Sequence, residues 1–228
     1  MPLKDPLSAL APAGALAVVA PHPDDETLGC GGLLAMAAAA GRDAVVILLT
    51  DGAASHPGSR REPPAVLARR RGEEIRRALD VLGLGTEALV ALGLPDGRLS
   101  EAPAGPIVAR LTGILRARGV ATVFATRPDD PHPDHRRAHA LAAAAADRVG
   151  AALWTYPVRA HGRPQGSAER LTRLPIGAVL AVKAAALRRH ASQWPGGVPD
   201  DPDGFSLTQA DLDFHLSGEE LYARAGSP

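Results

Sequence analysis

Short, uninterrupted apolar runs alternate along this chain with longer segments in which apolar residues recur at helical spacing. A run without a polar face predicts a strand covered on both faces, and an apolar stripe every three or four positions predicts an amphipathic helix. Strands are expected at 16–20, 43–50, 88–92, 120–126 and 151–156, and helices at 28–40, 65–82, 106–118 and from after His135 to Val149. This alternation predicts an α/β fold: a Rossmann-like, doubly wound, mainly parallel sheet with helices on both faces.

The alternation weakens after Pro157. A helix is still expected at 176–192 and a Pro/Gly/Asp loop at 195–204. Because no internal repeat or clean linker divides the sequence, we expect one domain over 1–228. Its core spans about 12–157, and a C-terminal extension at about 158–228 covers the site or mediates self-association as a homo-oligomer.

Composition narrows the choice of partners and compartment. The 228 residues include 25 Lys+Arg and 25 Asp+Glu, so charge gives no reason to propose nucleic acid or an anionic membrane as a partner. Cys30 is the single cysteine, which excludes an intramolecular disulfide and a cysteine-based zinc cluster. No apolar run reaches the ~20 residues that span a bilayer, and removing the leader-like stretch 7–20 would remove the first strand. We therefore expect no membrane span and a cytoplasmic location.

Two acidic, histidine-containing loops directly follow expected strands. The sequence PHPDDE occupies 21–26, after the first strand, and RPDDPHPDH occupies 127–135, after the fourth. In an open sheet of this kind the first and fourth strands commonly lie side by side, where the strand order reverses, and ligands bind beyond their carboxyl ends. Both loops are therefore expected to face one cleft.

The residue types in these loops favour a divalent metal. His22, Asp25 and His135 offer two neutral imidazoles and one carboxylate, which is three protein ligands with one coordination position left for water. Three ligands and an open position are typical of catalytic zinc, which lowers the pKa of water to roughly 7. Ferrous iron accepts the same donors.

Three neighbouring residues complete a hydrolytic site. Asp24 adjoins a ligand and is expected to take the proton of the water as general base. His132, as an imidazolium, is expected to stabilise an oxyanion and to protonate a departing amine. Asp134 is expected to orient His132 and keep it charged.

The pair of motifs, PHPDDE near the N-terminus and HPDH after a later strand, closely resembles the PIG-L/LmbE-like zinc-dependent deacetylases. The resemblance covers about the first 150 residues, with a weaker echo at 183–193. It implies an enzyme that removes an N-acetyl or other N-acyl group from a small-molecule amino sugar, such as N-acetylglucosamine, or from a sugar conjugate, with the ligands, base and oxyanion residue named above. It also implies that Arg71, in an R-x-x-E pattern with Glu74, and Asp96 contact the sugar. One position differs from the mycothiol-pathway enzyme: this chain has Asp130, two residues before His132, where that enzyme has a tyrosine.

Two other functions stay open. One is a non-catalytic, Rossmann-like ligand-binding module, although the chain lacks the glycine fingerprint of dinucleotide sites. The other is a metal-dependent esterase or phosphoesterase, and phosphoesterases usually draw on two metals and more carboxylates. Protein that is purified without bound metal would favour the binding module, and about two metals per chain would favour the esterase or phosphoesterase.

Several residues outside the two loops are expected to be structural. Gly29, Gly31 and Gly32 are expected to allow close packing of a helix, and Cys30 to be a small buried residue. His139 is expected to pack one helical turn away from the cleft. His190 has no assigned chemistry. Ordinary surface positions are expected for the remaining histidines, which are His56, His161 and His215.

Overall fold

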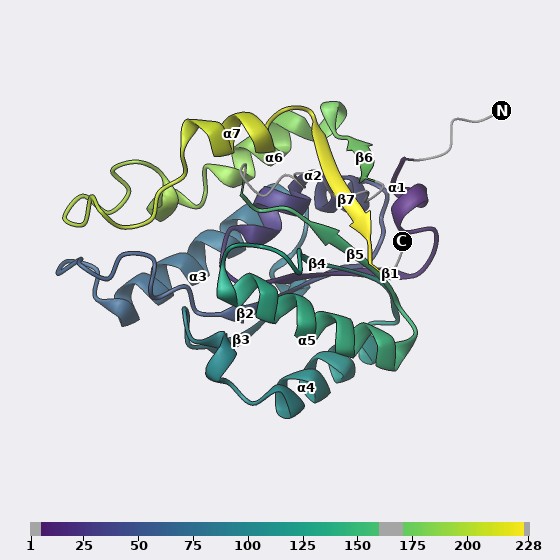
Figure 1. Ribbon diagram of the computed structural model, residues 1–228. Helices are drawn as coiled ribbons and strands as arrows, with labels where there is room; N and C mark the ends of the chain where they lie inside the picture. The colour runs from purple at the N-terminus through teal and green to yellow at the C-terminus, as the bar shows by residue number, and fades with distance from the viewer. Residues whose placement is uncertain (1–5, 160–170, 226–228) are drawn as a thin grey trace.

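The computed structural model describes residues 6–159 and 171–225 and contains one seven-stranded sheet (Figure 1). The strand order is β3-β2-β1-β4-β5-β7-β6. The strands are β1 (Ala15–Ala20), β2 (Ala44–Thr50), β3 (Leu89–Leu94), β4 (Val120–Thr126), β5 (Ala152–Tyr156), β6 (Leu171–Pro175) and β7 (Glu219–Arg224). Strands β1 to β5 are parallel to one another, so the predicted doubly wound, mainly parallel sheet is confirmed.

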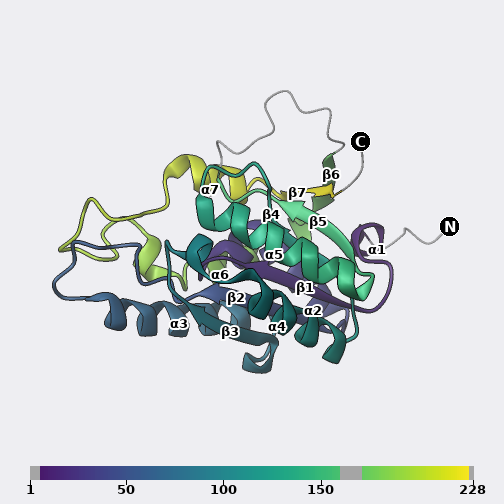
Figure 2. The ribbon, with the colours of Figure 1, turned by 60° about the horizontal axis from the view of Figure 1, so that its bottom comes forward.

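Helices cover both faces of the sheet, as predicted. They are α1 (Pro6–Leu10), α2 (Asp25–Ala39), α3 (Pro64–Val81), α4 (Ala104–Ala117), α5 (Pro133–Val149), α6 (Leu180–Leu187) and α7 (Gln209–His215). Figures 1 and 2 show α4 and α5 together on one face and α2 and α6 on the other. Side chains of β1 alternate between two cores: Val18 packs with residues of α2 and α3, and Val19 packs with residues of α4 and α5. This double burial explains why β1 has no polar face.

Strands β1 and β4 are neighbours, which confirms the adjacency on which the predicted site depends. Their register pairs Ala17 with Val123 and Val19 with Ala125. Strand order reverses between them, because β2 and β3 continue on one side and β5 on the other. The two histidine loops therefore leave the same edge of the sheet.

Glycines in α2 allow close packing, as predicted. A Cβ atom on Gly29 would lie 2.0 Å from Cδ2 of Tyr156, and one on Gly32 would lie 2.4 Å from Cγ2 of Ile176. Cys30 is fully buried beside them.

The C-terminal extension differs most from the prediction. It adds the antiparallel strands β6 and β7 to the sheet, and the expected helix at 176–192 shortens to α6 with 3₁₀ turns at Gly177–Val179 and Ala191–Gln193. The apolar pattern missed β7 because the strand carries a buried acid, Glu220. The Glu220 carboxylate accepts the backbone N–H groups of Gly32 and Leu33 in α2.

Residues of the extension also hydrogen-bond to backbone carbonyl groups of α2. Lys183 donates to the Leu28 carbonyl and to Glu220, both at 2.8 Å, and Tyr222 donates to the Gly29 carbonyl. The extension is therefore joined to the helix that follows the His22 loop.

The loop at 195–204 is anchored to the loop that follows β2. Asp200 accepts hydrogen bonds from the backbone N–H groups of Arg60 and Arg61, and Asp201 accepts one from Gly58. Carboxylates that accept several backbone N–H groups hold a turn in place.

Two histidines expected at the surface are buried, so that prediction is wrong for them. His56 is 5% exposed and packs against Gly204, whereas His215 is 3% exposed and lies with Nε2 2.6 Å from the Val158 carbonyl. The extension covers His56 and contains His215, and local periodicity did not predict how the extension packs. His161 lies outside the described residues. His139 packs as predicted, with Nδ1 3.0 Å from the Thr126 carbonyl. Within 6–159 and 171–225, no helix has the length and apolar character to cross a bilayer.

Candidate metal centre and active site

The loop between β1 and α2 has an unusual backbone conformation at Asp24. Its φ is 144°, and Asp24 is the single non-glycine residue with positive φ in the described part of the chain. The Asp24 N–H donates to Glu26 at 3.1 Å, and Glu26 also contacts Nε2 of His190 at 3.3 Å. Such strained backbone persists where its surroundings hold it in place, and it concentrates at functional sites.

Three donor atoms from the two loops converge on one point. Asp25 Oδ2 lies 3.2 Å from His22 Nδ1 and 3.4 Å from His135 Nε2, and the two nitrogen atoms are 3.2 Å apart. Tetrahedral metal bonds of ~2.0–2.1 Å place ligand atoms ~3.3–3.4 Å from one another, so these three residues fit a divalent cation. The structure thus brings together the three residues expected to bind the metal.

The charges around His22 favour a cation as well. Its ring faces carboxylates on both sides: Asp25 near Nδ1, and Asp96 and Asp134 near Nε2 at 3.1 Å and 3.5 Å. Burial lowers the pKa of His22, but these carboxylates outweigh burial and raise that pKa well above its usual value. A cluster this rich in carboxylates therefore requires positive charge.

The outer nitrogen of each expected histidine ligand faces a buried carboxylate. His22 Nε2 lies 3.1 Å from Asp96 Oδ1, and His135 Nδ1 lies 3.1 Å from Asp130 Oδ2. Neither nitrogen makes a hydrogen bond with its carboxylate in this geometry, so these are close ion-pair contacts. From the sequence alone, Asp130 stands out only as a departure from a relative, and its position two residues before His132 is the one available signal.

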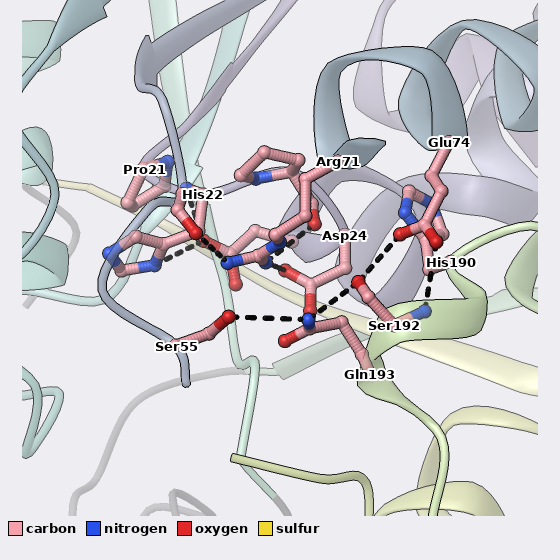
Figure 3. A network of polar contacts seen from close by, with 12 residues as sticks. Pro21, His22, Asp24, Ser55, Arg71, Glu74, His190, Ser192 and Gln193 are labelled. Atoms are coloured by element: carbon pink, nitrogen blue, oxygen red, sulfur yellow. Dashed lines mark hydrogen bonds and ion pairs between the residues drawn. The ribbon is translucent and has the colours of Figure 1, made fainter. Parts of the chain in front are cut away.

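Asp24 is paired with Arg71 and lines the same cavity as the triangle of donor atoms. Figure 3 shows the Arg71 guanidinium pointing toward Asp24, with Nη2 3.4 Å from Oδ1. Burial raises the pKa of Asp24 to about 6, and the charge of Arg71 opposes a larger rise. A carboxylate with a pKa in this range is well suited to take a proton near neutral pH.

Arg71 and Asp96, which the resemblance assigned to the sugar, are engaged with the protein. Arg71 is 2% exposed and donates to the carbonyls of Gly52 and Pro23 at 2.9 Å and 2.8 Å. Asp96 accepts the Ala54 N–H with Oδ2 while Oδ1 faces His22. Both still line the cavity described below.

His132 lies beside the two histidines of the triangle but differs from them electrostatically. Burial and the charges of His22 and His135 lower its pKa, so a neutral ring is favoured over the expected imidazolium. Its Nδ1 accepts the Asp134 N–H at 3.2 Å, which leaves the proton on Nε2. The expected orienting contact from the Asp134 carboxylate is replaced by this backbone contact, because that carboxylate accepts the N–H groups of Gly97 and Leu99.

A cavity of about 300 Å³ opens at these residues. Its lining combines polar side chains of the His22 and His135 loops with the apolar Val158, Phe205 and Leu207 of the extension. Arg159 lies 4.5 Å from the centre of the Phe205 ring. A small molecule that carries both polar and apolar groups fits such a lining.

The fold and site define a doubly wound α/β protein with a candidate metal centre at the switch point of its sheet. Comparison with protein families gives a match over residues 17–146, more than half of the chain, to PIG-L: GlcNAc-PI de-N-acetylase. The chain belongs to this family. Comparison with curated protein sequences gave no match.

Solved structures share the fold over most of the chain. A conserved protein of Thermus thermophilus, TT1542, is 30% identical with a TM-score of 0.66, over 93% of this chain and 95% of that one. The N,N'-diacetylchitobiose deacetylase of Pyrococcus horikoshii is 24% identical with a TM-score of 0.69, over 86% of this chain and 76% of that one. The zinc-inhibited form of teicoplanin deacetylase Orf2 is 19% identical with a TM-score of 0.70, over 94% of this chain and 100% of that one.

A hydratase has the same fold too. GalB of Pseudomonas putida, a 4-carboxy-2-hydroxymuconate hydratase, is 22% identical with a TM-score of 0.67, over 79% of this chain and 80% of that one. At this level of identity the likeness defines the fold, and the reaction must be argued from the site.

Proposed function

We propose that this protein is a metal-dependent hydrolase that removes an N-acetyl or other N-acyl group from an amino sugar or a sugar conjugate. The proposal rests on one observation: the donor atoms of His22, Asp25 and His135 lie 3.2–3.4 Å from one another beside the buried Asp24, in a cavity of small-molecule size. The deacetylase of Pyrococcus horikoshii and the family match support an amide as the bond that is cleaved.

Each residue has a separate task. His22, Asp25 and His135 would hold the cation, which when bound polarises a carbonyl and lowers the pKa of water. Asp24 takes a proton from the attacking water, because its pKa of about 6 makes it largely ionised yet basic at neutral pH. His132 donates from Nε2 to the oxygen that gains negative charge, since Nδ1 already accepts the Asp134 N–H.

Zinc is the proposed metal, and ferrous iron accepts the same donors. Besides the three proposed ligands, the described residues contain two further groups of side chains that could hold a cation: His22 with His132 and His135, and His22 with Asp96 and Asp134. Both groups include His22, which favours one cation per chain and therefore an amidohydrolase over a two-metal phosphoesterase. We further propose a cytoplasmic location and a single domain. We also propose self-association, and gel filtration would test the oligomeric state.

The test is release of free amine, detected with fluorescamine, from a panel of N-acetylated sugars and conjugates. Wild-type protein loaded with Zn²⁺ or Fe²⁺ should release amine from at least one of them. Asp24→Asn should lower kcat about 10²–10⁴-fold while the protein still binds one metal per chain. Asp147→Asn, at an exposed position of α5, is the matched control and should behave as wild type.

Two outcomes would contradict the proposal. Wild-type protein that binds no metal and no sugar would favour another role for the cavity, such as a non-catalytic binding module. Metal-dependent cleavage of esters or phosphate esters, with no amide cleaved, would move the reaction to the esterase or phosphoesterase class.

A further inference from the structure

The two histidines of the proposed metal centre each have a second ring nitrogen that must be satisfied. When one imidazole nitrogen binds a cation, the other carries the proton, and a buried N–H of this kind normally donates to a carboxylate or carbonyl. At His22 the second nitrogen is Nε2, and at His135 it is Nδ1. These nitrogens face Asp96 and Asp130, each at 3.1 Å.

Asp96 is fixed by its own neighbours, and its side chain is 7% exposed. Its Oδ2 accepts the Ala54 N–H at 2.9 Å, and its N–H lies 3.4 Å from Asp51 Oδ1. With Oδ1 facing His22, both carboxylate oxygens have partners within the protein. A sugar hydroxyl could reach this carboxylate only by sharing an oxygen that already has a partner.

Asp130 connects the two histidines of the second loop, and its side chain is 2% exposed. Oδ1 accepts the His132 N–H at 2.9 Å, while Oδ2 faces the His135 ring. Its carbonyl accepts a hydrogen bond from Arg136 at 2.7 Å. One carboxylate thus places the backbone of the proposed oxyanion residue and the ring of a proposed ligand.

We propose that Asp96 and Asp130 are positioning residues that set the tautomer and ring orientation of His22 and His135, so that Nδ1 and Nε2, respectively, face the cation. This inference rests on the metal centre of the proposed function. It gives Asp96 a task different from the sugar contact that the family resemblance implies. Asp134 is a weaker partner of His22, because its Oδ2 lies at 3.5 Å from Nε2 and accepts the Gly97 N–H.

The test measures metal affinity directly. Metal-free wild type, Asp96→Asn and Asp130→Asn would be titrated with Zn²⁺ against a chromophoric chelator. With Co²⁺, the visible absorption bands report the coordination of the ion. We expect each variant to bind Zn²⁺ about 10–100-fold more weakly than wild type and to show altered Co²⁺ bands. The exposed Asp147 of α5, changed to Asn, should leave affinity and bands unchanged.

A second readout separates positioning from substrate contact. At saturating metal, a positioning role of Asp96 leaves KM for the sugar within about twofold of wild type. If Asp96→Asn binds Zn²⁺ as wild type does and raises KM instead, Asp96 contacts the sugar and the inference is wrong for it. Equal Zn²⁺ affinity of Asp130→Asn and Asp147→Asn would overturn it for Asp130.

Folding is checked by circular dichroism, and Asp130→Glu provides a conservative variant. If Asp130→Asn does not fold, Asp130→Glu should retain the carboxylate contact and more of the affinity than Asp130→Ala; equal affinity of the two would overturn the inference. Failure of wild type to cleave any amide would remove the proposed reaction but leave the metal titrations as a full test. Failure of wild type to bind Zn²⁺ or Co²⁺ would remove both proposals.

Discussion

Nε2 of His135 lies 3.2 Å from Nδ1 of His22, although 113 residues separate the two histidines in the chain. The contact arises because β1 and β4 are paired and each ends at the same edge of the sheet. Two imidazoles brought this close beside Asp25 are costly to bury without a shared cation. A cation bound between these side chains should therefore raise the stability of the fold.

Metal should stabilise the wild-type fold. A ligand at 100 times its Kd that binds only the folded state adds ~2.7 kcal/mol, which corresponds to a rise in Tm of about 5–10 °C for a protein of this size. In His135→Gln the Zn²⁺-induced rise should disappear. Differential scanning fluorimetry with Zn²⁺ and with a chelator measures it. His139→Gln, one turn along α5, is the control, and an equal rise in both variants would contradict the proposed ligand.

Arg71 should support both stability and activity. Its guanidinium satisfies the carbonyls of Gly52 and Pro23 and lies beside Asp24. Arg71→Met leaves two buried carbonyls without these donors, so we expect a loss of about 1–3 kcal/mol per carbonyl in urea unfolding. We also expect kcat to fall at least tenfold, since the loop that carries Asp24 loses its anchor.

The exposed Arg69, changed to Met, is the control for Arg71. Arg71→Lys keeps the charge but not the two-armed geometry, so it should recover activity only in part. If Arg71→Met is as stable as wild type, the carbonyl groups of Gly52 and Pro23 accept hydrogen bonds from water instead, and the expected loss of stability is wrong.

Much of the fold could be predicted, because apolar runs and amphipathic segments alternate regularly over the first 150 residues. Strands β1, β2 and β4 contain only apolar residues and threonine, so their pattern is clear, and β4 was predicted at its observed bounds, Val120–Thr126. The convergence of His22 and His135 followed from the adjacency of β1 and β4 alone. The meeting of these two residues could therefore be predicted, because each lies in a segment that directly follows a strand whose place in the sheet was expected.

The extension was harder to predict for a physical reason. Strand β7 carries Glu220 at a buried position, and α6 carries the fully buried Lys183; both are satisfied by partners far away in sequence. A pattern of apolar residues cannot anticipate such pairs. The same holds for Asp96 and Asp130, because the histidine nitrogens that they face become visible only once the loops are assembled.

Gly29 should tolerate no side chain. A Cβ there would lie 2.0 Å from the buried Tyr156 ring, so Gly29→Ala must shift α2 or the ring, and we expect a loss of at least 1–3 kcal/mol. The matched control is Gly113→Ala in α4, where nothing lies within 4 Å of the added Cβ. That change should stabilise the fold by about 0.5–1 kcal/mol, because alanine is the better helix former. Urea unfolding should show a lower free energy of unfolding for Gly29→Ala and a higher one for Gly113→Ala. Equal changes in the two variants would contradict the close packing at Gly29.

The buried ion pair between Lys183 and Glu220 should be costly to break from one side. Lys183→Met leaves a carboxylate without its cation, so we expect a loss of about 3–5 kcal/mol. Adding Glu220→Gln removes that charge and should recover part of the loss. The exposed pair of Arg173 and Glu219 is the control: Arg173→Met should cost less than ~1 kcal/mol. A double variant less stable than Lys183→Met would contradict this account.

His215 should make the fold weaker in acid. Burial lowers the pKa of His215 to about 4, whereas an unfolded histidine has a pKa of about 6.5. Between these values the unfolded state binds the extra proton, so the free energy of unfolding falls by ~1.4 kcal/mol per pH unit as pH drops from about 6.5 to about 4. His215→Gln removes this titration. Urea unfolding at several pH values should therefore show the stability advantage of wild type over His215→Gln shrinking by up to ~3 kcal/mol across that window and staying constant below it. Parallel curves for the two proteins would mean that His215 accepts its proton without unfolding.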